Sequence, residues 1–574
     1  MGIEYQERAI DRHFAAFICC QAAACEVSDL FRLLVSLASS AIGKGSSCLN
    51  LADLDGETIV VGKREFFLPR FEGLVKLLKD SPTVGLPGGP PCPLVLDGSG
   101  HLYLYRYWQY EQELARRILQ KAGAASPNLD ENLLLHGLAR LFPGRGELDR
   151  QKEAALVALH RQFCVISGAP GTGKTSTVVR ILALLLEQDK SQRQRIAMAA
   201  PTGKAAARLK TSINDIKHSL DCSYEVKASI PDDVVTIHRL LGTLSRSARF
   251  RHSAGNPLPF DTVIIDEASM VALPMMSTLV TALRPDARLI LLGDSDQLAS
   301  VEPGSVFGDL CRTGAGSQVS PLRRSIVMLE KNYRFQAGSG IPEISRVVNN
   351  GMERDALELL KSGEGGVSWQ KLLSREELQN ALANKVVEGY RGYLEAESAR
   401  EALEQFDRFR VLCALREGPY GVSGLNRTVE NILAHEGLIS TKGAFYLGRP
   451  LMITVNNHAM QLFNGDTGIL FPDPENGGEL RAFFPAPDGG VRTLVPERLP
   501  LHETAYATTI HKSQGSEFGR VLMILPPNDS ELLTRELLYT GITRAKESVE
   551  IWANEEVFCA AVRKKTKRNS GFTF

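Results

Sequence analysis

Residues 163–175 read FCVISGAPGTGKT, a short apolar segment that runs directly into a glycine-rich loop. The first five residues, FCVIS, have the length and composition of a buried strand. The loop has the spacing G-x-x-x-x-G-K-S/T, and the STVVRILALLLEQ that follows it has the pattern of a helix. Strand, loop and helix stand in the order of a phosphate-binding P-loop, so this stretch predicts a nucleoside triphosphatase built on a parallel α/β sheet.

Each part of the loop has an expected task at the phosphates of ATP. Backbone N–H groups surround the β-phosphate, Lys174 neutralises the β- and γ-oxygens, and the Thr175 hydroxyl reaches Mg²⁺. The positive end of the following helix faces the same phosphates. The residues expected to bind ATP here are Gly168, Ala169, Pro170, Gly171, Thr172, Gly173, Lys174 and Thr175.

A magnesium partner is expected across the sheet from the P-loop. Residues 262–265 (TVII) have the pattern of a second buried strand, which ends in Asp266 and Glu267. Asp266 is expected to share Mg²⁺ with Thr175, and Glu267 is expected to orient the attacking water. An acid that only caps a helix would give the same letters, but the pairing with Lys174 favours the catalytic interpretation.

A third strand pattern, at residues 289–292, leads into GDSDQL. Asp294 and Gln297 therefore lie at the carboxyl end of a strand, where ligands bind in open α/β sheets. We expect Gln297 to sense the γ-phosphate. A Gly-Asp pair after a strand is also ordinary turn chemistry, so this segment by itself is a weak signal.

The composition is typical of a globular protein. The chain has 574 residues, 44% of them hydrophobic and 23% charged, and this length suits roughly three to five domains. Lys+Arg and Asp+Glu both number 66, so a nucleic-acid site must be a local basic groove. No stretch approaches the ~20 apolar residues that span a bilayer, and the opening MGIEYQERAIDRHF lacks a signal-peptide core. We therefore expect a cytoplasmic protein without a membrane partner.

Ten cysteines are scattered through the chain, which indicates reduced thiols. Cys19, Cys20, Cys25 and Cys48 could together hold zinc or an iron–sulfur cluster. Their spacing contains no C-x2-C pair, however, and the first three lie in the apolar run FAAFICCQAAAC. Small apolar side chains in a helix are the favoured interpretation.

Changes in pattern divide the chain into four expected parts. Helical and short alternating segments come first, and further helical stretches lead to a turn-forming PGRG near residue 145. Two α/β blocks follow, and Gly/Pro-rich short strands interrupt the second as a small β-barrel. The expected units are an N-terminal domain (1–112), a helical connector (113–147), and two α/β domains (148–327 and 328–574), with the barrel at about 440–500. The basic tail VRKKTKRNSGFTF is expected to fray.

Further motifs accompany the P-loop in a fixed order: APTGKAAARL, TIHRLLG, DEAS, GDSDQL, NYRF, ATTIHKSQGSEF and YTGITRAK. With them, residues ~150 to 546 resemble the superfamily 1B DNA helicases and, among these, the RecD family, the alpha subunit of exodeoxyribonuclease V. The segments CLNLADL, LYLYRYWQYEQELARRI and RHSAGNPL also resemble RecD. The resemblance implies an α/β fold of two RecA-like P-loop motor domains, with a β-hairpin insertion, an SH3-like barrel and a small N-terminal α/β domain.

The resemblance adds three residues to the ATP site. Gln151 matches the family glutamine that reads the adenine edge, although on its own it would be taken for a solvated helix residue. Arg334 in NYRF and Arg544 in GITRAK match two arginines that reach the γ-phosphate from the second α/β domain. Such groups stabilise transition-state charge and couple closure of the cleft to hydrolysis.

Matching positions also imply a DNA track over both α/β domains. Thr202 and Lys204 lie at a strand-to-helix turn of the kind that can hold a DNA phosphate. The other positions that match strand-contacting motifs are His238, Thr509, His511 and Ser513. A satisfied buried imidazole is the alternative for either histidine.

Residues 243–260, TLSRSARFRHSAGNPLPF, have the pattern of a hairpin with a turn at 254–256. The hairpin resembles the pin that splits the duplex in this family, and an inert surface hairpin is the alternative. Its basic side chains, which favour nucleic acid, are Arg246, Arg249, Arg251 and His252. Tyr103, Tyr105 and Tyr107 alternate as on one face of a half-buried strand, which we favour over a base-stacking platform.

The resemblance implies an ATP-driven 5′-to-3′ DNA motor that acts on single strands and duplex ends in double-strand break repair and recombination. RecB-like and RecC-like subunits would complete a heterotrimer, and the N-terminal domain has the size of a partner-docking domain. A free-standing RecD-like helicase is the alternative, because both kinds share the motor motifs. Outside DEAS we find no carboxylate cluster for a nuclease, so that centre is expected on another subunit. Intact Lys174, Glu267, Arg334 and Arg544 argue against an inactive scaffold.

Overall fold

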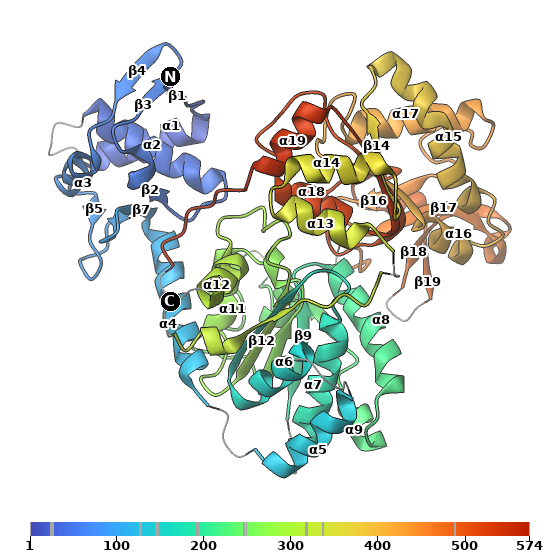
Figure 1. Ribbon diagram of the computed structural model, residues 1–574, viewed down its shortest axis with the longest axis horizontal. Helices are drawn as coiled ribbons and strands as arrows, with labels where there is room; N and C mark the ends of the chain where they lie inside the picture. The colour runs from blue at the N-terminus through green and yellow to red at the C-terminus, as the bar shows by residue number, and fades with distance from the viewer. Residues whose placement is uncertain are drawn as a thin grey trace.

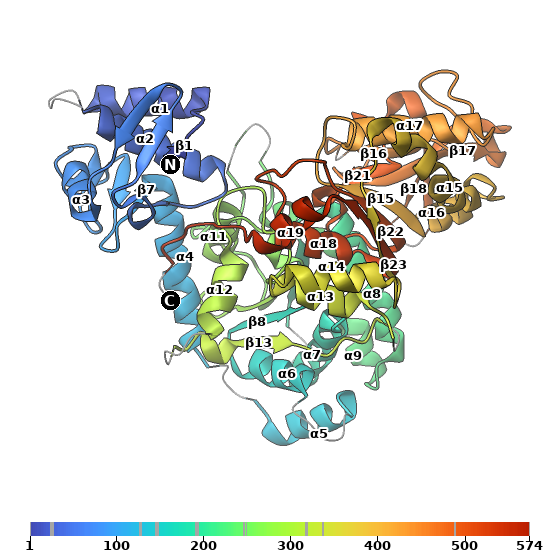
Figure 2. The ribbon, with the colours of Figure 1, turned by 45° about the horizontal axis from the view of Figure 1, so that its top comes forward.

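The computed structural model describes residues 2–22, 28–125, 129–143, 149–189, 194–244, 247, 249–315, 320–335, 338–457, 459–486 and 490–572. Figures 1 and 2 show two α/β domains packed on one another, with the N-terminal domain at one side. The long helix α4 (Tyr105–Gly123) joins the N-terminal domain to the first α/β domain. In the described part of the chain, no helix has both the length and the apolar character needed to cross a membrane.

The first α/β domain contains a six-stranded sheet in the order β10-β9-β11-β12-β8-β13, with every neighbouring pair parallel. Its central strands are apolar and buried because helices cover both faces. One apolar cluster joins the sheet to α6 and α7, and another joins it to α11 and α12. The strands are β8 (Phe163–Gly168), β9 (Ile196–Ala200), β10 (Val234–Thr236), β11 (Thr262–Ile265), β12 (Arg288–Gly293) and β13 (Ile326–Leu329). The helices are α5 (Glu131–Leu141), α6 (Arg150–His160), α7 (Lys174–Gln188), α8 (Gly203–Ser219), α9 (Tyr224–Ser229), α10 (Ile237–Leu241), α11 (Leu273–Thr281) and α12 (Val306–Ala315).

The second α/β domain repeats this plan with a five-stranded parallel sheet in the order β14-β23-β22-β15-β21. Apolar clusters again cover both faces, so the predicted pair of RecA-like domains is confirmed. The first sheet continues through β13 to Leu329, past the expected boundary at 327. The strands are β14 (Val367–Lys371), β15 (Phe409–Cys413), β21 (Ala507–Thr509), β22 (Phe518–Ile524) and β23 (Ala545–Ala553). The helices are α13 (Ile341–Asn349), α14 (Glu353–Ser362), α15 (Arg375–Leu394), α16 (Ala399–Phe406), α17 (Val422–His435), α18 (Arg535–Ile542) and α19 (Glu555–Arg563).

A five-stranded antiparallel sheet interrupts the second domain between α17 and β21, in the order β19-β18-β17-β16-β20. A small apolar cluster that includes Leu451, Leu470 and Phe484 forms its core. Among the described residues β19 and β20 share no ladder, so closure into an SH3-like barrel stays a prediction. The strands are β16 (Pro450–Ile453), β17 (Thr467–Asp473), β18 (Glu479–Pro485), β19 (Val491–Leu494) and β20 (His502–Thr504).

The described residues of the N-terminal domain form two small sheets and three helices around one apolar core. The sheets have the orders β1-β3-β4 and β2-β7-β6-β5. The strands are β1 (Ile3–Glu4), β2 (Leu49–Asn50), β3 (Thr58–Val61), β4 (Arg64–Phe67), β5 (Val84–Gly85), β6 (Leu94–Leu96) and β7 (His101–Leu104). The helices are α1 (Ala9–Gln21), α2 (Asp29–Gly43) and α3 (Phe71–Lys79).

The tyrosines at 103, 105 and 107 do not share a strand, so this prediction was wrong. β7 ends at Leu104 and α4 begins at Tyr105. Tyr103 is buried and its hydroxyl donates to Glu111 at 3.0 Å, whereas Tyr107 packs against the core of the first α/β domain. A strand and the helix directly after it each contributed tyrosines, and together they imitated an alternating pattern.

The segment 564–572 is held in place, contrary to the expectation that it frays. It leaves α19 and returns to the N-terminal domain, as the red trace in Figure 1 shows. The Asn569 carbonyl accepts hydrogen bonds from the N–H and the hydroxyl of Ser47, at 3.0 and 3.1 Å. Lys567 pairs with Asp53 at 2.7 Å. The basic tail is therefore ordered by polar and acidic partners far away in the sequence.

Candidate ATP site and nucleic-acid interface

The P-loop connects β8 to the first turn of α7. Gly171 and Gly173 have φ angles of 89° and 81°, in the left-handed region that favours glycine. A Cβ atom on Gly173 would lie 2.5 Å from Gln151 Nε2, so any larger residue would also clash there. The Thr172 hydroxyl donates to the Ala169 carbonyl at 2.8 Å and closes the loop. The glycines thus provide both the backbone shape and the room that the loop requires.

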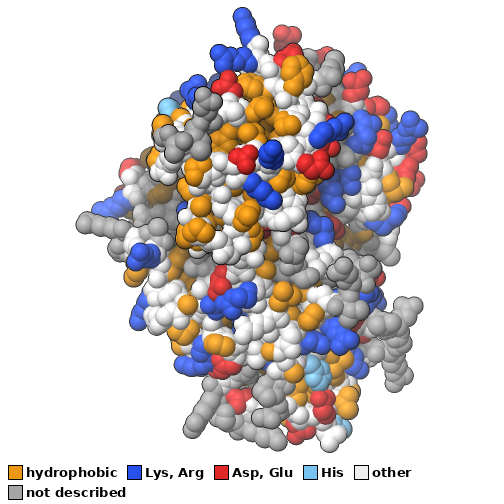
Figure 3. All heavy atoms as spheres, turned by 90° about the vertical axis from the view of Figure 1, so that its left-hand side faces the viewer, with side chains coloured by type: hydrophobic (Ala, Val, Ile, Leu, Met, Phe, Trp, Pro, Cys, Tyr) orange, Lys and Arg blue, Asp and Glu red, His pale blue; other side chains and the backbone are white. Residues whose placement is uncertain are grey.

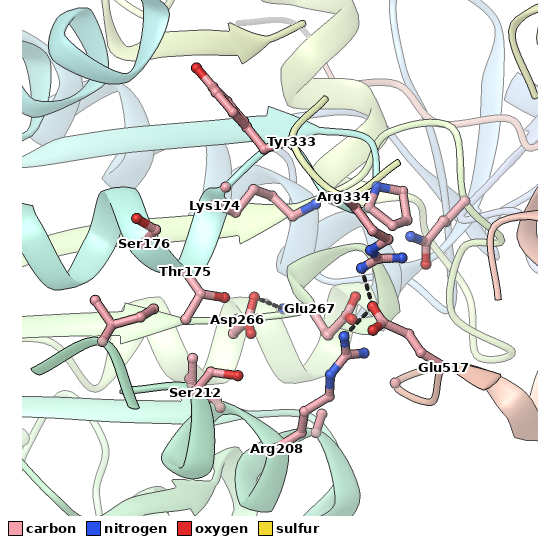
Figure 4. A pocket seen from close by; sticks show the side chains of 18 of the residues that line it. Lys174, Thr175, Ser176, Arg208, Ser212, Asp266, Glu267, Tyr333, Arg334 and Glu517 are labelled. Carbon is pink, nitrogen blue, oxygen red and sulfur yellow. Dashed lines mark hydrogen bonds and ion pairs between the residues drawn. The ribbon is translucent and has the colours of Figure 1, made fainter. Parts of the chain in front are cut away.

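A cavity of about 330 Å³ lies between the two α/β domains, in front of the P-loop (Figure 4). Its volume is in the range of small-ligand sites. The first α/β domain and the segment after β13 contribute Pro170, Gly171, Gly173, Lys174, Thr175, Ser176, Ala205, Arg208, Leu209, Ser212, Ile216, Asp266, Glu267, Gln297, Tyr333 and Arg334. The second domain contributes Gly515, Glu517 and Arg544. The six residues that the sequence predicted as catalytic therefore face one cavity.

Lys174 stands at the start of α7 and reaches back along the loop. Its ammonium donates to the Gly168 carbonyl at 2.6 Å and to the Ala169 carbonyl at 3.1 Å. Figure 4 shows its side chain extended toward Arg334. These two carbonyls hold a positive charge at the mouth of the loop, where the phosphates of a nucleotide would lie.

Asp266 and Glu267 follow the buried strand β11 and face Thr175 across the cavity (Figure 4). Asp266 Oδ1 accepts a hydrogen bond from the Glu267 N–H at 2.9 Å. Glu267 has a φ of 49°, a left-handed conformation that is uncommon outside glycine and is often found at functional sites. Burial and then the charge of Glu267 raise the pKa of Asp266 to about 6. Burial and the neighbouring Glu267 thus destabilise the anionic form of Asp266.

Replacing Asp266 by asparagine is expected to stabilise the nucleotide-free chain while it removes ATP hydrolysis. The pKa of Asp266 is raised from 3.8 to about 6, so ionisation opposes folding as pH rises through this window. We expect a gain of about 1–2 kcal/mol in unfolding free energy at pH 7.5 and a clearly smaller gain at pH 5. Thermal unfolding of the wild type and the variant in EDTA at both pH values measures this gain in unfolding free energy. Equal gains at both would show that the Asp266 charge is not their source.

Asp294 links the first domain to the second. It is buried just beyond β12 and accepts hydrogen bonds from Gln297 Nε2 at 3.0 Å and from the Tyr539 hydroxyl of α18 at 2.9 Å. Burial raises the pKa of Asp294. Among the described residues the buried Gln297 Oε1 has no hydrogen-bond partner, and Gln297 lines the cavity. The segment therefore lines the cavity and contacts the second domain at the same time.

Gln151 packs under the P-loop. Its side chain is buried, Nε2 donates to the Thr172 carbonyl at 3.1 Å, and Oε1 accepts from Arg180 at 3.2 Å. Asp149 caps the start of α6 and so fixes the position of Gln151. The amide braces the loop from behind, and its expected reading of the adenine edge stays a prediction.

Arg334 is fixed at its backbone and extended at its side chain. Its N–H donates to Asn332 Oδ1 at 2.9 Å, while Asn332 Nδ2 donates to the Pro170 carbonyl at 2.8 Å. The Tyr333 N–H donates to the Gly171 carbonyl at 2.8 Å. The NYRF segment therefore lies along the P-loop, and Arg334 projects from there toward the second domain (Figure 4).

Arg544 enters the cavity from the second domain, at the end of α18. It is 1% exposed, and it donates to the carbonyls of Thr540 and Ser516, each at 3.1 Å. Burial lowers the pKa of Arg544, and the charge of Glu267 opposes that change. A guanidinium so held is placed in advance, which is what stabilisation of a transition state needs.

Two cavity residues, Arg208 and Glu517, were missed by the sequence analysis. Glu517 Oε1 accepts hydrogen bonds from both Arg208 and Arg334. Burial alone would raise the pKa of Glu517, but Arg208 and then Arg334 hold it at about 2. Both residues stand inside quoted motifs, APTGKAAARL and HKSQGSEF. The available signal was a charged residue inside each motif, Arg208 in the second turn of α8 and Glu517 directly before β22.

Comparison with known proteins identifies the family. A model described as an AAA domain matches residues 151–303, and the N-terminal domain of the RecBCD enzyme subunit RecD matches residues 6–103. The UvrD-like helicase C-terminal domain matches residues 504–551. The RecBCD enzyme subunit RecD of Mycolicibacterium smegmatis is 38% identical over 547 residues, which cover 94% of this chain and 92% of that protein. The chain belongs to the RecD family.

Further relatives include both a RecBCD subunit and a RecD2 helicase. The RecBCD enzyme subunit RecD of Haemophilus influenzae is 36% identical over 522 residues, covering 82% of this chain and 79% of the relative. The ATP-dependent RecD2 DNA helicase of Deinococcus radiodurans is 30% identical over 487 residues, covering 82% of this chain and 58% of the relative. The RecD resemblance read from the motifs is therefore confirmed.

In this RecD-family chain, the first predicted DNA contacts lie where α8 meets the inserted sheet. The Thr202 hydroxyl caps α8 by accepting from the Ala205 N–H at 3.2 Å. A Cβ on Gly203 would lie 2.7 Å from the ring of Phe463, so glycine permits this close approach. Burial lowers the pKa of Lys204, which the nearby Asp407 and then Asp466 oppose. Lys204 is therefore partly buried, near Asp407 of the second domain and Asp466 of the inserted segment.

The other predicted DNA contacts differ in exposure. His238 is exposed on α10, with its ring 5.9 Å from that of Phe250. Thr509 Oγ1 accepts from the Lys512 N–H at 3.2 Å. His511 is partly buried, and burial lowers its pKa. Ser513 is 2% exposed and its hydroxyl donates to the Ile510 carbonyl, so this side chain faces its own domain.

The segment 243–260 contains two short antiparallel bridges and no regular strand among its described residues. Thr243 pairs with Phe250, and a tight turn between Ser253 and Asn256 stands where the sequence placed one. The exposed basic side chains described here are those of Arg249 and Arg251. Arg246 lies outside the described residues. The use of this segment to separate strands stays a prediction.

Proposed function

We propose that this RecD-family chain is an ATP-driven helicase motor that moves 5′ to 3′ along single-stranded DNA as a subunit of a cytoplasmic RecBCD-type enzyme. The observation that carries the proposal is the cavity between the two RecA-like domains. Lys174, Asp266 and Glu267 line it from one domain, and Arg544 lines it from the other. Hydrolysis in such a cavity changes the distance between the domains, which is how a motor moves along a strand.

The residues of the cavity divide the hydrolysis of ATP between them. Lys174 and the loop N–H groups hold the β- and γ-phosphates, and Glu267 orients and deprotonates the attacking water. Arg334 and Arg544 neutralise the charge that develops on the γ-phosphoryl oxygens. Because Arg544 belongs to the second domain, the catalytic set is complete only when the domains are close together.

The donor set also fits a divalent cation. Asp266 and the Thr175 hydroxyl line the same cavity and would hold Mg²⁺, with phosphate oxygens and water as its remaining ligands. Burial raises the pKa of Asp266, and a cation beside it would lower this pKa again. The ionised carboxylate would therefore be stabilised by a bound cation. Bound Mg²⁺ supplies neutralisation of the phosphate charge. Among the described residues no group of three or more acidic, His or Cys side chains could hold a metal.

A DNA track is proposed along the carboxyl ends of both parallel sheets. β9 and β10 are neighbours in the first sheet, so the starts of α8 and α10 lie together at one edge. These two helix starts carry Thr202 and His238. Thr509 is the last residue of β21 in the second sheet, and His511 follows two positions later. Together with Arg249 and Arg251 these residues are proposed to contact the strand, largely at its phosphates.

The N-terminal domain is proposed to dock on RecB-like and RecC-like subunits. Figure 3 shows apolar side chains gathered on the upper part of the face seen there, over the N-terminal domain. Exposed apolar side chains of this domain are Ile3, Ile10, Phe17, Phe67 and Leu86. Apolar surface of this kind favours a protein interface. The match of residues 6–103 to the RecD N-terminal domain supports a complex subunit over a free-standing helicase such as RecD2.

Unwinding of tailed duplexes tests the proposed motor. The full chain with ATP and Mg²⁺ is expected to unwind a duplex that carries a 5′ single-stranded tail, and to leave a blunt or 3′-tailed duplex intact. Strand separation is followed by loss of quenching between labelled strands. Equal activity on the 3′-tailed duplex would refute the polarity.

Near-stoichiometric co-purification with RecB-like and RecC-like subunits is expected, whereas an active monodisperse monomer would favour the free-standing alternative.

A further inference from the structure

Glu517 holds two arginines that come from different places in the fold. Its Oε1 atom accepts from the Nη2 groups of both Arg208 and Arg334, as the dashed lines in Figure 4 mark. The third cation near this carboxylate is Lys546, whose ammonium lies 3.7 Å from Oε2. The carboxylate is 10% exposed, so solvent screens these charges weakly. Two guanidinium groups on one oxygen repel each other, and either binds more favourably alone.

The Arg334 side chain is the part of this cluster that can turn toward a nucleotide. Its backbone is fastened to the P-loop through Asn332 and Tyr333, so only the side chain is free to move. Its Nη1 is buried and has no hydrogen-bond partner among the described residues. A buried donor without a partner is unfavourable, and phosphate oxygens in the cavity would supply the missing acceptor.

Arg208 connects the same carboxylate to the proposed DNA track. It lies on the face of α8 that lines the cavity, together with Ala205, Leu209 and Ser212. The start of this helix carries Thr202 at the N-cap and Lys204 in the first turn, about 9 Å and about 6 Å along the helix axis from Arg208. An α-helix moves as a rigid body over such a distance, so a displacement of the first turn also displaces Arg208.

We propose that Glu517 is a positioning residue that holds Arg334 away from the nucleotide until DNA at the start of α8 brings Arg208 fully onto the carboxylate. Arg334 is then released to the γ-phosphate, and hydrolysis accelerates. The Arg208–Glu517 pair thus couples DNA binding to ATP turnover. This inference rests on the proposed function, because it assumes an ATPase that single-stranded DNA stimulates.

Two substitutions are expected to remove DNA stimulation in opposite ways. Glu517→Gln no longer holds Arg334, so the kcat without DNA should rise about fivefold to tenfold and further stimulation should be lost. In Arg208→Ala, Arg334 has no competitor for Glu517, so the DNA-stimulated kcat should fall about tenfold and the kcat without DNA should not rise. The double variant should behave like Glu517→Gln alone, because Arg208 acts through Glu517.

The measurement is steady-state ATP hydrolysis by the full chain with and without oligo(dT), with kcat and KM for ATP determined separately. Arg208→Lys keeps the charge and should recover part of the stimulation. Lys210→Ala removes a charge from the same helix outside the cavity and serves as the matched control, with both rates retained. Circular dichroism checks folding, and Glu517→Asp replaces Glu517→Gln if the latter does not fold, with a stimulation between wild type and none.

The outcomes separate the relay from the proposed function. If the wild-type chain hydrolyses ATP without stimulation by oligo(dT), or not at all, the proposed function fails. If wild-type hydrolysis is stimulated but Glu517→Gln lowers both rates in the same proportion, Glu517 is only structural and the relay is wrong. A rise of the DNA-free rate in Arg208→Ala would also overturn it, because Arg334 would then be restrained by Arg208 and not by Glu517.

Discussion

Replacing Lys174 by glutamine is expected to lower ATP turnover by about a hundredfold to a thousandfold or more. The ammonium donates to the Gly168 and Ala169 carbonyls and so is held at the mouth of the P-loop. Glutamine keeps the length of the stem nearly unchanged but brings no positive charge to the β- and γ-phosphates. Steady-state phosphate release in the presence of single-stranded DNA measures the loss.

DNA binding is expected to survive this substitution, since the proposed DNA contacts lie at other strand ends. Fluorescence anisotropy with a labelled single strand checks this, and Lys227→Gln on α9, outside the cavity, is the matched control for loss of a lysine from the same domain. If the Lys174 variant kept its turnover, the phosphate site would have been assigned to the wrong loop.

The sequence predicted those parts of the fold that depend on neighbouring residues. FCVIS, TVII and the apolar run before GDSDQL all form buried parallel strands. Their short length, their β-branched residues and the turn-forming or acidic residues directly after them favoured strands over buried helices. The prediction failed at Tyr105, where a strand changes into a helix without a turn residue between them. No glycine, proline or capping residue marks that junction, and the tyrosine alternation concealed it.

Contacts between distant segments could not be predicted in this way. Arg334 and Glu517 are 183 positions apart, and Asp294 and Tyr539 are 245 positions apart. Each pair joins two elements that meet only when both α/β domains have packed together. A motif gives the residue type at each position but does not show which charged residues form ion pairs. Glu517 therefore had no predicted role, although the motif that contains it, ATTIHKSQGSEF, was recognised. The tail at 564–572 shows the same limit, since its partners lie in the N-terminal domain.

Further long-range contacts join the two α/β domains beside the cavity. Gln514 Nε2 donates to the Leu298 carbonyl at 2.9 Å, and the Leu298 N–H donates to the Thr540 hydroxyl at 3.0 Å. Both bonds join the segment after β12 to the second domain, beside Gln297. If Gln297 senses the γ-phosphate as proposed, the change there is directly next to the second domain and needs no long path to reach it.

Replacing Arg544 by lysine is expected to lower the DNA-stimulated kcat by about a thousandfold or more, in the range known for arginines that stabilise phosphoryl transfer. The guanidinium donates to the carbonyls of Thr540 and Ser516 and also lines the cavity. The ammonium of a lysine is a single point charge, so it cannot keep both carbonyl contacts and face the cavity at the same time. Binding of ATP should weaken less than tenfold, because Lys174 and the P-loop belong to the other domain. Steady-state kinetics and equilibrium binding of a fluorescent ATP analogue separate the two effects.

Arg410→Lys is the matched control for the loss of a buried guanidinium from the second domain. Arg410 is 2% exposed and donates to the Ala505 carbonyl at 2.9 Å, but it does not line the cavity. Its substitution should lower the thermal unfolding midpoint and leave kcat within a few-fold of wild type. Arg544→Lys should show the reverse, a large loss of kcat with a modest change in unfolding. If both variants lost stability and activity in parallel, Arg544 would serve the packing of its domain, and the charge that completes the cavity would have to come from Arg334 or Arg208.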